Sequence, residues 1–222
     1  MPQLSQDAIE ILYRVPVLLL SFMIHELSHA LVALWNGDTT AKDAGRITLN
    51  PLKHIDLIGA ALLIFARFGW AKPVPINPNN FRRPKQGIVM TSLAGPLSNV
   101  LLAFIFAVPY MALMLKYDIG SLEQFSAPAV AINLFWEFVL INMSLAAFNL
   151  IPIPPLDGSK VLFAILPDRI YYNYVLRFER YGMILLIALS LTGILGRLMS
   201  PMYNGLWRLI VTVLRPIILR FA

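Results

Sequence analysis

Residues 21–30 read Ser-Phe-Met-Ile-His-Glu-Leu-Ser-His-Ala and place an H-E-x-x-H motif inside a long apolar run. On a helix, residues four positions apart lie on one face, so His25 and His29 can hold one metal ion between them. Glu26 lies about 100° around the helix from His25, close enough to reach a water on that ion. The alternative is two buried histidines bonded to nearby backbone, but ionisable groups at membrane depth are costly and typically functional. The motif predicts a metal centre that needs a third ligand from elsewhere.

The composition indicates that this helix lies in a lipid bilayer. Of 222 residues, 58% are hydrophobic and only 14% are charged, and the mean hydropathy is +0.70. A soluble domain of this size exposes far more charge, so we predict a polytopic membrane protein. Cysteine is absent, which leaves His, Asp and Glu as zinc ligands. We assign the net charge of +6 to loops facing an anionic cytoplasmic leaflet and expect no nucleic-acid binding.

The apolar segments predict an all-α membrane protein with three core spans, at residues 9–35, 87–115 and 128–150. A fourth span is expected at residues 181–199. The tail, residues 205–222, carries three arginines and either crosses the bilayer or lies in its interface. One or two C-terminal helices therefore follow the core. We expect a catalytic core over residues 1–165 and a helical extension over residues 166–222.

The connection between the first two spans contains an insertion. Its apolar segment at residues 58–68 is too short to cross a bilayer as a helix. Residues 45–51 alternate like a short strand, and the prolines in residues 70–78 exclude helix and allow at most an edge strand. We predict a re-entrant or β-hairpin-like insertion. Residues 70–78 are either a substrate-facing strand or an interfacial anchor held by Trp70 and Lys72.

Charge in the loops predicts the topology. If residues 58–68 do not cross, residues 37–86 form one loop with eight basic and three acidic residues. Residues 151–180 fall on the same side and hold four basic residues, whereas residues 116–127 hold only Lys116 against Asp118 and Glu123. The positive-inside rule then puts the N-terminus outside and both basic loops in the cytoplasm. The two histidines and Asp157 thereby lie at one level, on the cytoplasmic side of a cell membrane.

Asp157 is the candidate third metal ligand. It follows a proline-rich turn at the mouth of the third span and precedes Gly158. The alternative role is an N-cap for a helix that begins near Ser159. Asn149, eight residues earlier, either hydrogen-bonds the oxyanion of a tetrahedral intermediate or satisfies carbonyls freed ahead of Pro152.

Other polar residues have simpler interpretations. We expect Ser98 and Asn99 to make hydrogen bonds between spans, beside the small surface of Ala94 and Gly95. Glu137 and Asn142 lie at mid-span, and we assign Asn142 no role. Glu137 is either a partner of the metal ligands or a polar contact inside the bundle, and we favour the bundle contact. His54 is expected to be an ordinary loop histidine.

Three motifs together resemble one family. They are His25-Glu26-Leu27-Ser28-His29, Ala94-Gly95-Pro96-Leu97-Ser98-Asn99, and the run from Phe148 through Pro152-Ile153-Pro154-Pro155-Leu156-Asp157-Gly158. In this order they resemble the site-2 protease family of intramembrane zinc metalloproteases, over about three quarters of the chain. The resemblance implies zinc ligands at His25, His29 and Asp157, a general base at Glu26, and Asn149 near the oxyanion. The chain differs from larger relatives in having no room for a PDZ or nucleotide-binding domain.

The expected function is zinc-dependent hydrolysis of peptide bonds within or near the transmembrane segments of membrane-protein substrates. Zinc activates water, and Glu26 accepts its proton. An unwound substrate segment leaves backbone groups unpaired, which the strand-like segments near Ile47 and Val74 can hydrogen-bond. Two alternatives stand beside this hypothesis: a zinc-dependent membrane hydrolase of a lipid or small amide, and a non-catalytic membrane protein that retains the metal. The intact Glu26 argues against the non-catalytic alternative.

Overall fold

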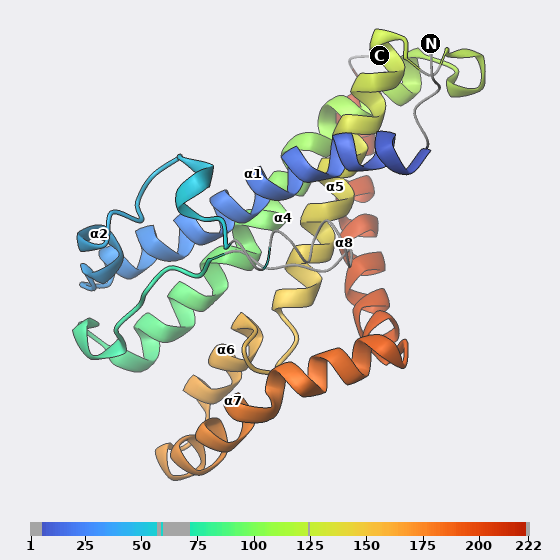
Figure 1. The fold of residues 1–222 in the computed structure, drawn as a ribbon. Helices are drawn as coiled ribbons and strands as arrows, with labels where there is room; N and C mark the ends of the chain where they lie inside the picture. The colour runs from blue at the N-terminus through green and yellow to red at the C-terminus, as the bar shows by residue number, and fades with distance from the viewer. Residues whose placement is uncertain (1–5, 57–58, 60–71, 124, 221–222) are drawn as a thin grey trace.

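The computed structural model describes residues 6–56, 59, 72–123 and 125–220, and over these residues every regular element is helical (Figure 1). In chain order the elements are α1 (Gln6–Trp35), α2 (Thr40–Asp43), η1 (Pro51–Lys53), η2 (Pro78–Asn80), α4 (Pro84–Lys116), η3 (Ile119–Ser121), α5 (Ala127–Asn149), α6 (Asp157–Ile165), α7 (Asp168–Leu191) and α8 (Ile194–Ile218). The all-α prediction is confirmed.

Three helices are long and apolar enough to cross a membrane, namely Tyr13–Trp35, Pro84–Lys116 and Ala127–Asn149. They match the three predicted core spans. Internal prolines occur at Pro16 in α1 and at Pro96 and Pro109 in α4. Such prolines are tolerated in membrane helices because neighbouring helices and local adjustments satisfy the freed backbone groups.

Helix α4 is the central element of the bundle. It packs against both α1 and α5, which also contact each other, and α8 covers part of α4 and α5 (Figure 1). Ala103 and Ala107 of α4 are fully buried against Val139 and Met143 of α5. Small residues let helix backbones approach closely where lipid provides no hydrophobic driving force.

Another face of α4 is apolar and is not covered by α1, α5 or α8. Leu97, Leu101 and Ile105 follow one another at four-residue spacing and are 60%, 61% and 51% exposed. Four-residue spacing places them on one stripe of the helix. This stripe is the surface that the acyl chains of a bilayer would contact, as expected for a multi-pass membrane protein.

The end of α1 is fixed by Asn36-Gly37-Asp38. Gly37 has a φ of 108°, and its N–H donates to the carbonyl of Leu34, while the N–H of Asp38 donates to that of Ala33. This pair of bonds is a Schellman motif, which requires a residue with positive φ and therefore favours glycine. A Cβ at Gly37 would also lie 3.1 Å from the carbonyl oxygen of Asn80. The motif places Asp38 directly beneath the helix end.

The chain returns to this same end of the bundle before α4 begins. The N–H of Arg82 donates to the carbonyl of Asn36 at 2.9 Å. The connection between the first two spans therefore begins and ends at the same end of the bundle. The predicted re-entrant segment, residues 58–68, lies outside the described residues apart from Gly59.

One local prediction is wrong. Residues 45–51 form no strand: the N–H of Asn50 donates to Thr48 Oγ1, and Asn50 Oδ1 accepts from the N–H of Leu52, which starts η1 instead. Such side-chain bonds compete with a strand ladder. The fourth span expected at residues 181–199 falls on a bent pair of helices rather than one straight helix: Gly193 has a φ of 71°, and α7 meets α8 at 85°.

Candidate metal centre

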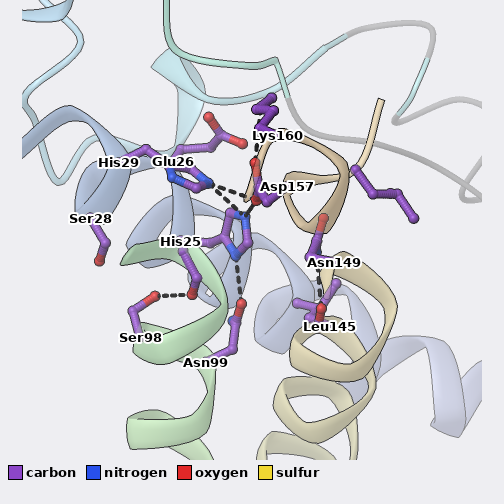
Figure 2. A network of polar contacts seen from close by, with 12 residues as sticks. His25, Glu26, Ser28, His29, Ser98, Asn99, Leu145, Asn149, Asp157 and Lys160 are labelled. Carbon is purple, nitrogen blue, oxygen red and sulfur yellow. Dashed lines mark hydrogen bonds and ion pairs between the residues drawn. The ribbon is translucent and has the colours of Figure 1, made fainter. Parts of the chain in front are cut away.

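Three buried side chains meet inside the bundle. His25 and His29 lie one turn apart on α1, and Asp157 begins α6; each residue is 5% exposed. The Nε2 atoms of the two histidines are 3.0 Å apart, and Asp157 Oδ2 lies 3.2 Å from His25 Nε2 and 3.0 Å from His29 Nε2. Figure 2 shows the three groups pointing toward one another. The structure thus brings together the three residues that the sequence predicted as ligands.

The far side of each imidazole faces an oxygen atom. His29 Nδ1 lies 2.6 Å from the carbonyl oxygen of Thr91, which can only accept, so Nδ1 carries the hydrogen. His25 Nδ1 lies 2.5 Å from Asn99 Oδ1 (Figure 2). With hydrogen on Nδ1, each ring turns the lone pair of Nε2 toward the shared centre.

This donor set fits zinc. Two imidazole lone pairs and a carboxylate oxygen face one point with no hydrogen among them, an arrangement that a cation stabilises. Their separations of 3.0–3.2 Å are close to the edge of about 3.3 Å for a tetrahedron with zinc–ligand bonds of 2.0–2.1 Å. Gly95 of α4 leaves the space open, because a Cβ there would collide with the Nε2 atoms of both histidines.

Asp157 is held so that one oxygen faces the histidines. Lys160 Nζ lies 2.9 Å from Asp157 Oδ1, which leaves Oδ2 for the shared centre (Figure 2). Burial raises the pKa of the Asp157 carboxyl, whereas the charge of Lys160 lowers it. The ion pair with Lys160 favours the ionised carboxylate, the form that binds metal. Lys160 was not predicted, although its i,i+3 spacing from Asp157 is visible in the sequence.

Glu26 receives a hydrogen bond from a distant segment. The N–H of Val74 donates to Glu26 Oε2 at 2.8 Å. Residues 72–77 have no regular structure, and proline has no N–H, so Val74 supplies the sole backbone donor of Pro73-Val74-Pro75. That donor fixes one oxygen of the carboxylate and leaves Oε1 for another partner.

Asp38 holds this segment against α1. Its Oδ2 accepts from the N–H of Asn77 at 2.7 Å, and its Oδ1 accepts from Asn80 Nδ2 at 2.9 Å and from Thr40 Oγ1 at 2.5 Å. Burial raises the pKa of the fully buried Asp38, but these hydrogen bonds outweigh it and hold the pKa below its ordinary value. We call these hydrogen bonds of Asp38 to Asn77, Asn80 and Thr40 the Asp38 clamp. Because Asn77 follows Val74 by three residues, the Asp38 clamp determines the position of the Val74 N–H.

The remaining predicted residues lie as follows. Asn149 ends α5, and its Nδ2 donates to Leu145 O in the same helix at 2.9 Å (Figure 2). Glu137 pairs with Arg14 of α1 at 3.4 Å, a polar contact between two helices in which the Arg14 side chain is 42% exposed. The buried His54 contacts the carbonyl of Thr48 within its own loop.

Comparison with known proteins identifies the family. The sequence pattern of "Peptidase family M50" matches residues 111–192, a segment that contains Asn149 and Asp157. A Bacillus subtilis protein named "Putative zinc metalloprotease YwhC" is 39% identical over 194 residues, which span 87% of this chain and 86% of the relative. "Putative zinc metalloprotease Rip2" of Mycolicibacterium smegmatis is 29% identical over 81% of this chain and 66% of the relative.

A more distant relative is longer. "Zinc metalloprotease MJ0392" of Methanocaldococcus jannaschii is 27% identical over 72% of this chain, which covers 35% of that protein. No solved structure matches the chain significantly. The motifs in the sequence, the family match and the near full-length similarity to YwhC agree. The chain therefore belongs to peptidase family M50, the site-2 protease family of zinc metalloproteases.

Proposed function

We propose that this protein is an intramembrane zinc metalloprotease that hydrolyses peptide bonds within or near the transmembrane segments of membrane-protein substrates. The observation that carries the proposal is the meeting of His25, His29 and Asp157 inside a bundle of membrane-spanning helices, with Glu26 on the same turn of α1. His25 Nε2, His29 Nε2 and Asp157 Oδ2 would hold the ion. When bound, zinc acts as a Lewis acid that makes water a nucleophile at neutral pH.

Three residues of the chain have proposed roles in the reaction: Glu26, Val74 and Asn149. Glu26 accepts the proton of the attacking water through its free Oε1 and delivers it to the leaving amine. The Val74 N–H keeps Oε2 in place, so the base is oriented before substrate arrives. Asn149 is proposed to hydrogen-bond the oxyanion, for which its amide must turn from the Leu145 carbonyl toward the substrate.

The substrate is proposed to be an unwound transmembrane segment. Residues 72–77 lie beside Glu26 without regular structure, and the N–H of Lys72 donates to the carbonyl of His54 at 2.9 Å. Lys72, Pro73 and Pro75 are exposed, whereas Val74 is 7% exposed and packs with Ala30 and Ala41. The backbone groups of this segment that are not already bonded can hydrogen-bond an unwound peptide, whose own backbone groups would otherwise stay unpaired in the membrane.

We also propose that the site opens toward the cytoplasm and that the N-terminus lies outside. The end of α1 that carries Asn36 meets the basic run Arg82-Arg83 at the start of α4. The opposite end of the bundle carries the loop with Lys116, Asp118 and Glu123. The positive-inside rule assigns the basic end to the cytoplasm.

The substrate class is tested by direct comparison. Purified protein in lipid nanodiscs, loaded with zinc, is given a membrane-spanning peptide and, separately, a long-chain lipid amide. We expect cleavage of the peptide inside or next to its apolar segment and no turnover of the lipid amide. Turnover of the lipid amide without cleavage of the peptide would contradict the protease assignment and favour a membrane amidohydrolase.

A further inference from the structure

A continuous chain of buried hydrogen bonds leads from the metal centre into the bundle. It joins three helices: His25 Nδ1 of α1 meets Asn99 Oδ1 of α4 at 2.5 Å, and Asn99 Nδ2 donates to Asn142 Oδ1 of α5 at 2.8 Å. Asn142 Nδ2 then donates to Ser21 Oγ and to the carbonyl of Phe138, each at 2.9 Å. Ser21, Asn99 and Asn142 are all fully buried.

The direction of this chain is fixed at its far end. The Phe138 carbonyl can only accept, so Asn142 must face it with Nδ2 and present Oδ1 to Asn99. Asn99 must then donate through Nδ2, which leaves Oδ1 toward His25. The Ser21 hydroxyl can rotate to donate or accept and therefore imposes no direction.

The two histidines obtain the same tautomer by different means. His29 faces the backbone carbonyl of Thr91, which cannot present a donor. His25 faces a side-chain amide, which can turn over and present a donor instead. Were Asn99 reversed, its Oδ1 would oppose Asn142 Oδ1 in a buried site, leaving two acceptors unpaired.

We propose that Asn99 and Asn142 are positioning residues that fix His25 in the Nδ1–H tautomer, so that its Nε2 lone pair faces the metal. Asn142 bonds Asn99, Ser21 and Phe138 rather than a histidine, and it acts on His25 through Asn99. The inference rests on the proposed zinc function. From the sequence we expected Asn99 to make hydrogen bonds between spans and assigned Asn142 no role, so a part in the metal centre is new for both.

The first test replaces Asn142 by leucine, which removes its donor and acceptor while keeping a similar volume. Asn142→Leu frees Asn99 to turn over, and zinc affinity, measured by competition with a chelator, is expected to fall by about 10- to 100-fold. Asn133→Leu is the matched control, because it makes the same change at an exposed position of the same helix. We expect the control to bind zinc like wild type. Equal zinc affinity in Asn142→Leu and wild type would overturn the inference.

A rescue separates the tautomer from packing. In the Asn142→Leu background, Asn99→Asp places an acceptor opposite His25 in either orientation of the side chain. The double variant is expected to recover most of the lost zinc affinity. If affinity stays low although the double variant unfolds at the same temperature as Asn142→Leu, the loss is one of packing and the inference fails.

Nitrogen-15 spectra of histidine-labelled wild type give a readout that needs no variant. The chain has only three histidines. In zinc-free protein, at a pH where imidazoles are neutral, His25 is expected as the Nδ1–H tautomer, and Nε2–H would contradict the inference. Wild type that binds no zinc at all would instead overturn the proposed function, so the two failures are distinguishable.

Discussion

The backbone N–H of Val74 donates to Glu26 Oε2 at 2.8 Å, across 48 positions in the sequence. Pro73 and Pro75 flank Val74 and offer no competing donor. The position of this N–H depends on the Asp38 clamp, because Asp38 holds Asn77 three residues further along. The orientation of the Glu26 carboxylate, the proposed base, is thus fixed by the loop that contains Val74 and not by helix α1 alone.

Asp38→Asn should lower the rate of cleavage while zinc content is retained. An asparagine replaces one acceptor oxygen by a donor, which opposes the N–H of Asn77 or the donors of Thr40 and Asn80. The loss of a buried charged acceptor should also cost about 1.5–3 kcal/mol of stability. Zinc stoichiometry, cleavage and thermal unfolding are compared with those of Asp118→Asn, an exposed aspartate in the opposite loop. Unchanged cleavage in Asp38→Asn would contradict a role for the clamp.

The stability difference between wild type and Asp38→Asn should depend on pH. The pKa of Asp38 is lowered in the folded protein from an ordinary value of 3.8. Its contribution to stability is therefore full above pH 3.8 and is lost as the pH falls through the folded pKa. Unfolding temperatures of the two proteins should differ most at neutral pH and converge in acid. A constant difference down to strongly acidic pH would show that the carboxylate charge plays no part.

Asp157→Ala and Asn149→Ala should separate metal binding from transition-state stabilisation. Asp157 Oδ2 faces both histidines, so its removal should lower zinc content. Asn149 bonds within its own helix, so its removal should leave zinc content unchanged and slow cleavage by about 10²- to 10³-fold if it serves the oxyanion. If Asp157→Ala binds zinc as tightly as wild type, Asp157 is no ligand. Full activity in Asn149→Ala would remove that residue from the mechanism.

The proposed topology can be tested on this cysteine-free chain. Single cysteines at Asn79 and Glu123 occupy exposed positions at opposite ends of the bundle. An impermeant thiol reagent should label the cysteine at position 79 only from the cytoplasmic side and the one at position 123 only from outside. The reverse pattern would invert the orientation, and labelling of both from one side would contradict the three-span bundle.

The sequence predicted those parts of the fold that depend on local pattern. Apolar length predicted the three spans, and the i,i+4 spacing predicted that His25 and His29 share a face. Asp157 was placed with them because loop charge and span parity put it at the same membrane level. The break at Gly193 was missed because the apolar residues run on through it, and the turn is a backbone feature of one glycine.

Other parts of the site depend on contacts that no local pattern encodes. The Val74 amide reaches Glu26 only because Asp38 and the Schellman turn at Gly37 hold the returning loop. Asn142 was placed at mid-span without a role, because its link to His25 passes through Asn99 of a different helix. The sequence does contain one signal for this contact. In Pro73-Val74-Pro75 only Val74 has a backbone N–H, and that N–H is the donor to Glu26.

The most direct test of the proposed function compares Glu26→Gln with wild type for both zinc content and cleavage of a membrane-spanning peptide. The substitution removes the base and leaves all three proposed ligands, so zinc should be retained while the rate falls by about 10²-fold or more. Glu123→Gln makes the same change at an exposed loop position and should match wild type in both measurements. Wild-type cleavage by zinc-loaded Glu26→Gln would contradict the proposed mechanism.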